Sequence, residues 1–411
     1  MKKKIITSCI LSFLLLMQTF IASSQQSEPI PWNQFKGFYR NGVASGNTLA
    51  EKIPENGPKM LWKKKTGSAF SEITIMGNQI YTMLSEKTDS VSGLEFAVAF
   101  DAKTGNEIWK TLIDSIFIDV DGWGDGPRST PAIGQDFVYS FSGRGKLTAT
   151  SKTDGKIAWQ VDFVKEFGST IPRWGFANSP LLIGDLVVME AGGSENRAFI
   201  AFDAKTGKVV WAKGKGNSTY NSPSVANIDG ETQIIFANGI YLYSFNAQGD
   251  TLWTLKTPIG NPTALPLVFD SNKVFISAIR NTGFIVAEFN KNGAKELING
   301  TAMKNDYSTS VYYDGYIYGF NVAALTCISA TTGEKKWTKR GFGKGSLILV
   351  DDKLLVLSDQ GKIIQVKATP DAYTEQGSFQ AIEGKSWTAP SFSDGKVYVR
   401  NLTEMACFDL N

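Results

Sequence analysis

Apolar and polar residues alternate along short segments of this chain, and residues typical of tight turns separate the segments. One such segment, residues 97–105, ends in Asp-Ala-Lys-Thr-Gly, and Trp109 follows four residues later. Alternation of period two predicts a β-strand, and glycine supplies the positive φ that a tight hairpin needs. The pattern therefore predicts a hairpin whose second strand carries a large flat side chain, which can wedge between neighbouring sheets.

The same unit recurs along the chain. Further copies lead to Trp159, Trp211, Trp253 and Trp337, two weaker copies lack the tryptophan, and a last copy stops at its turn. One equivalent position in the third strand marks each copy, about 40–50 residues after the previous one, as is typical of propeller blades of four short strands. These positions are Ala99, Ala149, Ala201, Ser244, Ala287, Cys327, Gln365 and Cys407. We therefore predict an all-β protein, an eight-bladed β-propeller of four-stranded antiparallel blades.

The two ends of the repeat array predict how the ring closes. The last copy has three strands but no fourth, and residues 59–63, which include Trp62, form a spare strand near the N-terminus. If this strand completes the last blade, no open edge remains. The propeller then spans residues 59–411, after an N-terminal segment of residues 25–58. Cys327 and Cys407 fall in blades six and eight, which are not adjacent, so we expect two buried thiols without a disulfide.

Residues 1–24 have the features of a secretory signal peptide. Three lysines precede an apolar run from Cys9 to Met17, and Ala22 and Ser24 stand before a cleavage site at Gln25. The alternative is an uncleaved anchor, but spanning a bilayer takes ~20 apolar residues. Cleavage removes three of the charges behind the net +3 and leaves a neutral chain, so no basic surface for nucleic acid is expected. We expect a periplasmic or secreted monomer without a transmembrane segment.

Candidate catalytic chemistry is sparse. The chain has no histidine, which excludes Ser-His-Asp and Cys-His catalysis and histidine-ligated zinc. Asp101, Asp203 and Asp409 recur at equivalent turns, which indicates a structural role. A glycan-processing enzyme would need a carboxylate pair, and none is fixed by the sequence.

The repeat resembles a known family. The pattern Asp-x-x-Thr-Gly-x-x-x-Trp is similar to the pyrroloquinoline-quinone-type (PQQ-like) repeat of quinoprotein alcohol dehydrogenases and of the propeller lipoprotein of the outer-membrane β-barrel assembly machinery. Residues 32–37, 41–43, 174–180, 384–390 and 398–401 look like segments of exported PQQ-like repeat proteins. The likeness covers nearly all of the chain after the signal peptide. Unlike the catalytic quinoproteins, this chain has no adjacent cysteine pair and is shorter.

The mouth of the central channel is the expected binding site, because the innermost strands of all blades begin there. A ring of cations, amides and aromatic side chains there could hold a planar anionic ligand such as a cofactor, with the alternative that these side chains only cap loops and channel. The candidates are Glu72, Trp123, Arg128, Arg173, Trp174, Asn178, Asn221, Tyr307, Lys344 and Trp387. Residues 119–126 resemble part of a calcium loop, but Trp123 occupies a ligand position, so an Asp-Gly-rich turn is favoured. No metal ligand is assigned.

Two functions are consistent with these features. The favoured one is a non-catalytic binding or scaffold propeller in the cell envelope, which needs no cofactor and presents its loops to a protein or glycan partner. The alternative is a quinone-dependent alcohol or sugar dehydrogenase with PQQ and Ca²⁺ in the channel mouth. Exposed aromatic residues on one rim would favour the first. Convergence of Arg128, Asn178 and Lys344 in a deep funnel would favour the second.

Overall fold

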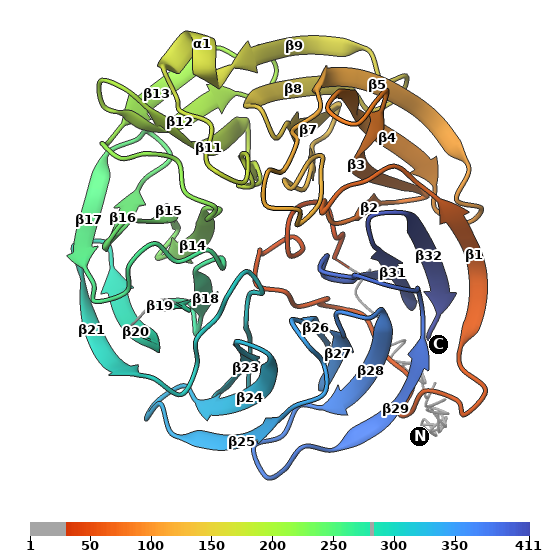
Figure 1. The fold of residues 1–411 in the computed structure, drawn as a ribbon. Coiled ribbons are helices and arrows are strands. Elements are labelled where there is room, and N and C mark those ends of the chain that lie inside the picture. The colour runs from red at the N-terminus through yellow and green to blue at the C-terminus, as the bar shows by residue number, and fades with distance from the viewer. Residues whose placement is uncertain (1–29, 280–282) are drawn as a thin grey trace, which may run out of the picture.

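The computed structural model describes residues 30–279 and 283–411, which form a ring of eight four-stranded antiparallel sheets around a central axis (Figure 1). The predicted eight-bladed propeller is thus confirmed. In each blade the first strand lies innermost and the fourth lies on the outside of the ring (Figure 1). The predicted signal peptide, residues 1–24, lies outside the described residues.

The blades follow one another in chain order. The first four comprise β2 (Thr74–Met76), β3 (Gln79–Lys87), β4 (Gly93–Asp101) and β5 (Glu107–Ser115); β6 (Ala132–Ile133), β7 (Phe137–Phe141), β8 (Lys146–Ser151) and β9 (Ile157–Asp162); β10 (Leu181–Ile183), β11 (Leu186–Gly193), β12 (Arg197–Asp203) and β13 (Val209–Lys213); and β14 (Ser224–Ile228), β15 (Glu231–Asn238), β16 (Tyr241–Phe245) and β17 (Thr251–Lys256).

The remaining four blades complete the ring. They comprise β18 (Leu267–Phe269), β19 (Lys273–Ala278), β20 (Gly283–Asn290) and β21 (Gly293–Gly300); β22 (Val311–Tyr313), β23 (Tyr316–Asn321), β24 (Ala324–Ser329) and β25 (Lys335–Lys339); β26 (Ser346–Val350), β27 (Lys353–Leu357), β28 (Lys362–Lys367) and β29 (Glu375–Gln380); and β30 (Ser391–Ser393), β31 (Lys396–Arg400) and β32 (Glu404–Asp409) with β1 (Lys59–Lys65).

The strand register explains why a small residue and a tryptophan recur together. In the first blade Ala99 of β4 lies directly opposite Trp109 of β5, and the same pairing joins Cys327 to Trp337 in the sixth. A small side chain leaves room for the indole, which leans toward the next blade. The small residue and the tryptophan therefore recur together in the sequence because they form a cross-strand pair in each blade.

Five of the six indoles also bond to the following blade, whereas Trp253 donates to Gln233 of its own blade. Trp109 Nε1 donates to the main-chain oxygen of Lys152 (3.1 Å), in the turn of the second blade. The ring lies against Gly155 of that turn, where an added Cβ would come within 2.7 Å of the indole. Gly155 also has a φ of 72°. The turn glycine thus serves two purposes: it makes the hairpin and it leaves space for the tryptophan of the preceding blade.

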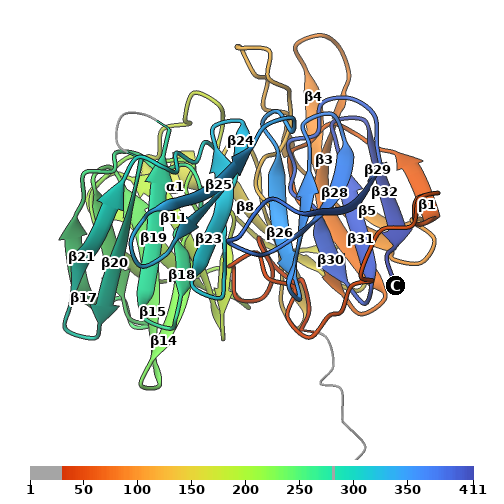
Figure 2. The same ribbon diagram turned by 90° about the horizontal axis from the view of Figure 1, so that it is seen from below.

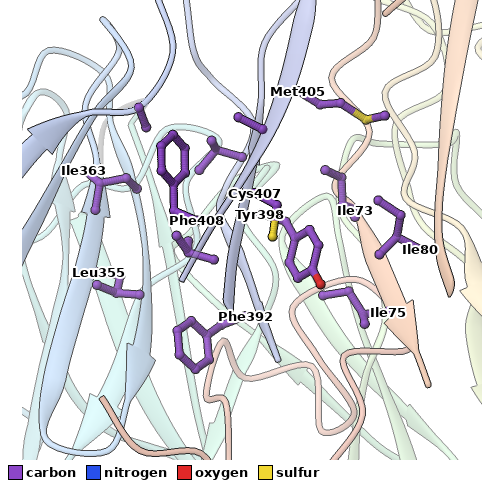
Figure 3. Packing of buried hydrophobic residues seen from close by; sticks show 14 of the residues in the cluster. Ile73, Ile75, Ile80, Leu355, Ile363, Phe392, Tyr398, Met405, Cys407 and Phe408 are labelled. Atoms are coloured by element: carbon purple, nitrogen blue, oxygen red, sulfur yellow. The ribbon is translucent and has the colours of Figure 1, made fainter. Parts of the chain in front are cut away.

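Strand β1 closes the ring as predicted. It pairs antiparallel with β32, and Trp62 lies opposite Cys407 in the register that the other blades use. A continuous buried cluster crosses this junction (Figure 3), with Phe392, Tyr398 and Cys407 of the eighth blade between Leu355 of the seventh and Ile75 of the first. Both chain ends are therefore tied into one sheet and no sheet edge stays open there.

The N-terminal segment crosses one end of the channel. The main-chain oxygen of Asn33 accepts a hydrogen bond from Ile133 N (2.7 Å), and the main-chain oxygen of Gly42 accepts one from Leu349 N (2.8 Å). The segment thereby joins the second blade to the seventh, which is three blades away around the ring. It is the red chain in the middle of Figure 1 and along the lower face in Figure 2. The N-terminal segment forms these hydrogen bonds with residues within the first strands of the blades. It therefore covers the end of the channel that lies opposite the loops leading into those strands.

Two further features complete the fold. A single turn of helix, α1 (Phe163–Phe167), is capped by the Asp162 side chain and ends at Gly168.

Cys327 and Cys407 are free and buried, as expected for small residues opposite an indole. In the described part of the chain, no helix is long and apolar enough to cross a membrane.

Candidate functional site

A cavity of about 310 Å³ lies on the propeller axis, between the N-terminal segment and the loops that lead into the first strands. All eight blades contribute to its wall, through the first strand or the segment just before it. The lining residues are Phe35, Lys36, Phe70, Glu72, Asp119, Trp123, Arg128, Trp174, Ala177, Tyr220, Ser222, Thr263, Asp306, Tyr307, Ser308, Lys344, Ser346, Trp387, Thr388 and Ala389. Since the N-terminal segment closes one end of the channel, the cavity opens toward the loop face.

The floor of the cavity holds a buried cluster of charges. Lys36 Nζ lies 3.3 Å from Glu72 Oε1, and both side chains are only 3% exposed. Arg40 lies behind them and donates to the main-chain oxygens of Pro180 (2.7 Å) and Ser179 (3.3 Å). Burial raises the pKa of Glu72, against the attraction of Lys36. Burial also lowers the pKa of Arg40 to about 9, which leaves the guanidinium charged at neutral pH.

Two further ion pairs stand in the wall. Arg128 donates to Asp119 Oδ2 at 2.6 Å and to the main-chain oxygen of Gly126 at 2.8 Å. Its guanidinium lies 5.2 Å from the Phe70 ring centroid. In another part of the wall, Lys344 Nζ lies 2.8 Å from Asp306 Oδ2. Each wall cation therefore faces a carboxylate, and each pair offers both donors and acceptors to a bound molecule.

Aromatic side chains make up much of the remaining wall. Trp387 is central among them, with ring centroids 6.1 Å from Phe70, 5.6 Å from Trp123 and 5.7 Å from Tyr307. Trp123 is 43% exposed at the cavity mouth, and Lys385 donates to its main-chain oxygen at 3.2 Å. The site thus combines stacking surfaces with three ion pairs in a concave space closed at one end.

The structure brings seven of the ten predicted site residues into this cavity: Glu72, Trp123, Arg128, Trp174, Tyr307, Lys344 and Trp387. The other three lie elsewhere. Arg173 makes a bidentate contact with Asp121 on the surface, at 2.6 and 2.7 Å. Asn178 and Asn221 are buried and donate to main-chain oxygens of Glu190 and Ala264, each at 2.5 Å. Their side chains hold strand ends and loops together because a buried amide needs a partner.

The chemistry of the cavity also depends on residues outside the sequence candidates. Phe35 and Lys36 come from the N-terminal segment, which is not part of the repeat and so gives no positional signal. Asp119 and Asp306 complete the ion pairs with Arg128 and Lys344. Asp306 directly precedes the predicted site residue Tyr307, so the sequence could have placed it near the cavity. The sequence could not have shown its ion pair with Lys344.

The Asp-rich loop of residues 119–126 uses its carboxylates within the protein. Asp119 contacts Arg128, Asp121 contacts Arg173, and Asp125 lies 2.5 Å from Lys87 Nζ. The contact with Arg173 and a hydrogen bond from Trp174 lower the pKa of Asp121 to about 2. The carboxylates point to three separate cations, so the loop has the contacts of an Asp-Gly turn held by salt bridges.

These features define a closed eight-bladed propeller with a one-ended, aromatic-lined axial cavity. The family model described as outer membrane protein assembly factor BamB matches residues 95–339, more than half of the chain. The protein therefore belongs to this family of PQQ-like repeat propellers. None of the curated protein sequences compared with the chain matches it.

Solved structures share the fold at low sequence identity. BamB from Moraxella catarrhalis is 13% identical with a TM-score of 0.61, over 85% of this chain and 97% of that one. The quinohemoprotein alcohol dehydrogenase ADHIIG from Pseudomonas putida is 14% identical with a TM-score of 0.66, over 93% of this chain and 80% of that one. A europium-containing methanol dehydrogenase is 11% identical with a TM-score of 0.68, over 92% of this chain and 91% of that one. These likenesses establish the fold.

The cavity residues do not fit a quinone with a calcium ion. Calcium takes six to eight oxygen ligands, and the cavity carboxylates Glu72, Asp119 and Asp306 each face a cation at 3.3 Å or less. Among residues 30–279 and 283–411, no three His, Cys, Asp or Glu side chains gather into a group that could hold a metal ion. The wall cations are likewise already paired, so a ligand with several carboxylates would have to displace their partners.

Proposed function

We propose that the protein is a non-catalytic binding protein of the cell envelope, which holds part of a glycan or protein partner in its axial cavity. The observation that carries this proposal is the pairing of each wall cation with a carboxylate inside an aromatic-lined cavity. Such a surface recognises a ring with hydroxyl groups, because hydroxyls donate and accept at once. Membership of a family described as an outer membrane assembly factor, together with the signal peptide that the sequence predicts, supports an envelope location.

The size of the cavity limits what it can hold. A volume of about 310 Å³ is at the small end of ligand pockets, which run from ~300 to ~1,000 Å³. It admits one ring of a glycan or one side chain of a partner, while the rest of the partner lies on the loop face. Val120, which is 78% exposed and three residues from Trp123, would be among the first residues to meet it.

Tryptophan fluorescence offers a direct test, since Trp123, Trp174 and Trp387 all line the cavity. We expect soluble fragments of envelope glycans to change the fluorescence saturably, and Trp387→Ala to abolish binding. Phe38→Ala is the control, because Phe38 is an aromatic residue that is 44% exposed but does not line the cavity. If no fragment binds, or if Phe38→Ala weakens binding as much as Trp387→Ala, the cavity is not a glycan-binding site.

The dehydrogenase alternative has its own measurement. The likeness to quinohemoprotein and methanol dehydrogenases supports a shared fold. Calorimetric titration of the protein with PQQ, with and without Ca²⁺, separates the two functions. Tight one-to-one binding that depends on Ca²⁺, followed by oxidation of an alcohol or sugar with an artificial electron acceptor, would overturn the binding-protein proposal. The ion-paired cavity predicts no such binding.

A further inference from the structure

We propose that the cavity floor binds the carboxylate of a hexuronic acid, with the sugar ring held among the aromatic side chains above it. This inference rests on the proposed function and names the class of ligand for the same cavity. Its three supports are the charge balance at the floor, the polar atoms of the lining without partners, and the donor–acceptor pairs of the wall.

The floor carries more positive than negative charge. Lys36 forms an ion pair with the Glu72 carboxylate, Arg40 forms none within the described residues, and all three side chains are nearly fully buried. The Arg40 Nη atoms donate to main-chain oxygens, which carry no net charge. Burying an uncompensated charge is costly, so a single additional anion is favoured at this position. One carboxylate supplies the charge that is missing.

Three polar atoms of the cavity lining lack hydrogen-bond partners. Within residues 30–279 and 283–411, the Lys36 ammonium forms its ion pair but no hydrogen bond, and the Ser308 and Ser346 hydroxyls have no partner at all. Each of these residues is at most 5% exposed and lines the cavity. Buried polar groups are normally hydrogen-bonded. Three donors that share one cavity match the lone pairs of a carboxylate, which can accept about four hydrogen bonds.

The wall favours a sugar over an aromatic acid. Arg128 with Asp119, and Lys344 with Asp306, present a donor beside an acceptor at two places. A sugar acid has several hydroxyl groups that can bridge both pairs, whereas an aromatic acid with one hydroxyl group would leave a pair without contacts. Trp387 and its neighbours offer aromatic faces to the ring. A single pyranose also suits a cavity of about 310 Å³.

The test is a fluorescence or calorimetric titration with four probes: glucuronate, galacturonate, glucuronamide and glucose. We expect a hexuronate to bind at least about tenfold more tightly than glucuronamide, which has the same ring but no charge. Ser308→Ala and Ser346→Ala should each weaken hexuronate binding about tenfold without lowering the melting temperature, because these hydroxyls contribute no hydrogen bond to the fold. Ser391→Ala is the matched control, since its hydroxyl is also buried and without a partner in the described chain, yet lies outside the cavity lining.

The outcomes separate this inference from the proposed function. If glucose or glucuronamide binds as tightly as the hexuronates, the carboxylate site is overturned while the binding function stands. If Ser391→Ala weakens binding as much as the two cavity variants, the cavity lining is not the contact. If none of these sugars binds but another envelope glycan does, this inference fails and the proposed function stands; if no envelope glycan binds, this inference and the glycan part of the proposed function both fail. A double variant, Lys36→Met with Glu72→Gln, removes the charged pair together and should abolish the preference for acid over amide.

Discussion

The indole Nε1 of Trp62 donates a 2.9 Å hydrogen bond to the main-chain oxygen of Ala102, across the boundary between the last blade and the first. Trp62 stands in β1, near the start of the described chain, but it belongs to the blade that contains the C-terminus. The equivalent hydrogen bond from Trp109 to Lys152 joins two blades that follow one another in the sequence. The Trp62 hydrogen bond instead joins the two ends of the repeat array, together with the hydrogen bonds of Arg400 to Thr82, Met83 and Gly67.

Removing the Trp62 side chain should weaken the junction between the last blade and the first. Trp62 is 6% exposed and packs beside Tyr398, with ring centroids 6.0 Å apart. Trp62→Ala leaves a large cavity and an unpaired Ala102 oxygen, and should lower the free energy of unfolding by about 3–5 kcal/mol. Urea denaturation followed by circular dichroism measures this. Trp123→Ala, at an indole that is 43% exposed, should cost less than about 1 kcal/mol; equal losses would show that Trp62 does not close the ring.

The turn glycine that receives Trp62 gives a sharper test of the same contact. Gly105 has a φ of 66°, and an added Cβ would lie 2.7 Å from the Trp62 ring. Gly77 has a similar φ of 60°, but nothing lies within 4 Å of its Cβ position. Gly77→Ala should cost about 1–2 kcal/mol through backbone strain alone. Gly105→Ala should cost about 1–3 kcal/mol more, and this excess should disappear in a Trp62→Ala background. Equal costs for the two glycines would contradict the wedge.

Stability should fall as the pH rises through neutrality. Glu95 is fully buried and accepts from Phe117 N (2.9 Å) and Gly143 N (3.0 Å), and burial raises its pKa to about 7. Burial likewise raises the pKa of Glu190 to about 7. The folded chain therefore holds protons that the unfolded chain releases above about pH 4.5, so the stabilisation is present below that pH and is lost up to about pH 7.

This loss can be assigned to single residues. Each glutamate accounts for at most about 3 kcal/mol between pH 4.5 and 7. Urea denaturation at pH 5 and pH 8 should show a smaller difference in Glu95→Gln and Glu190→Gln than in the parent chain. Glu107→Gln, at an exposed glutamate of β5, should leave the difference unchanged. An unchanged difference in the two buried variants would mean that these carboxyl groups are ionised in the fold.

The two thiols should be unreactive until the protein unfolds. Burial raises the pKa of Cys327 and of Cys407 to about 12, and each thiol lies opposite an indole inside a blade. The thiolate is the reactive form, so Ellman's reagent should find no thiol in the folded chain without residues 1–24, and two after unfolding in guanidinium chloride. Rapid reaction of either thiol at pH 8 would contradict its position in the blade interior.

The ring architecture was predictable because its determinants are local. The glycine turn and the tryptophan four residues later fix one hairpin, and eight copies of the unit fix the blade number. The incomplete last copy and the spare strand with Trp62 then fix the closure. All ten predicted site residues precede innermost strands, which begin at the same end of the channel, and seven of the ten line the cavity.

The tertiary structure alone decided the chemistry of the cavity. Lys36 lies outside the repeat, so only the path of the N-terminal segment across the channel brings it to Glu72. Arg128 and Lys344 are cations without an assigned partner in the sequence, but in the fold Asp119 of the same loop neutralises Arg128, and Asp306 of another loop neutralises Lys344. Asn178 turns inward to a main-chain oxygen because a buried amide must find a partner. The repeat pattern thus determined the blades, whereas the contacts of residues that occur once were set only when the ring closed.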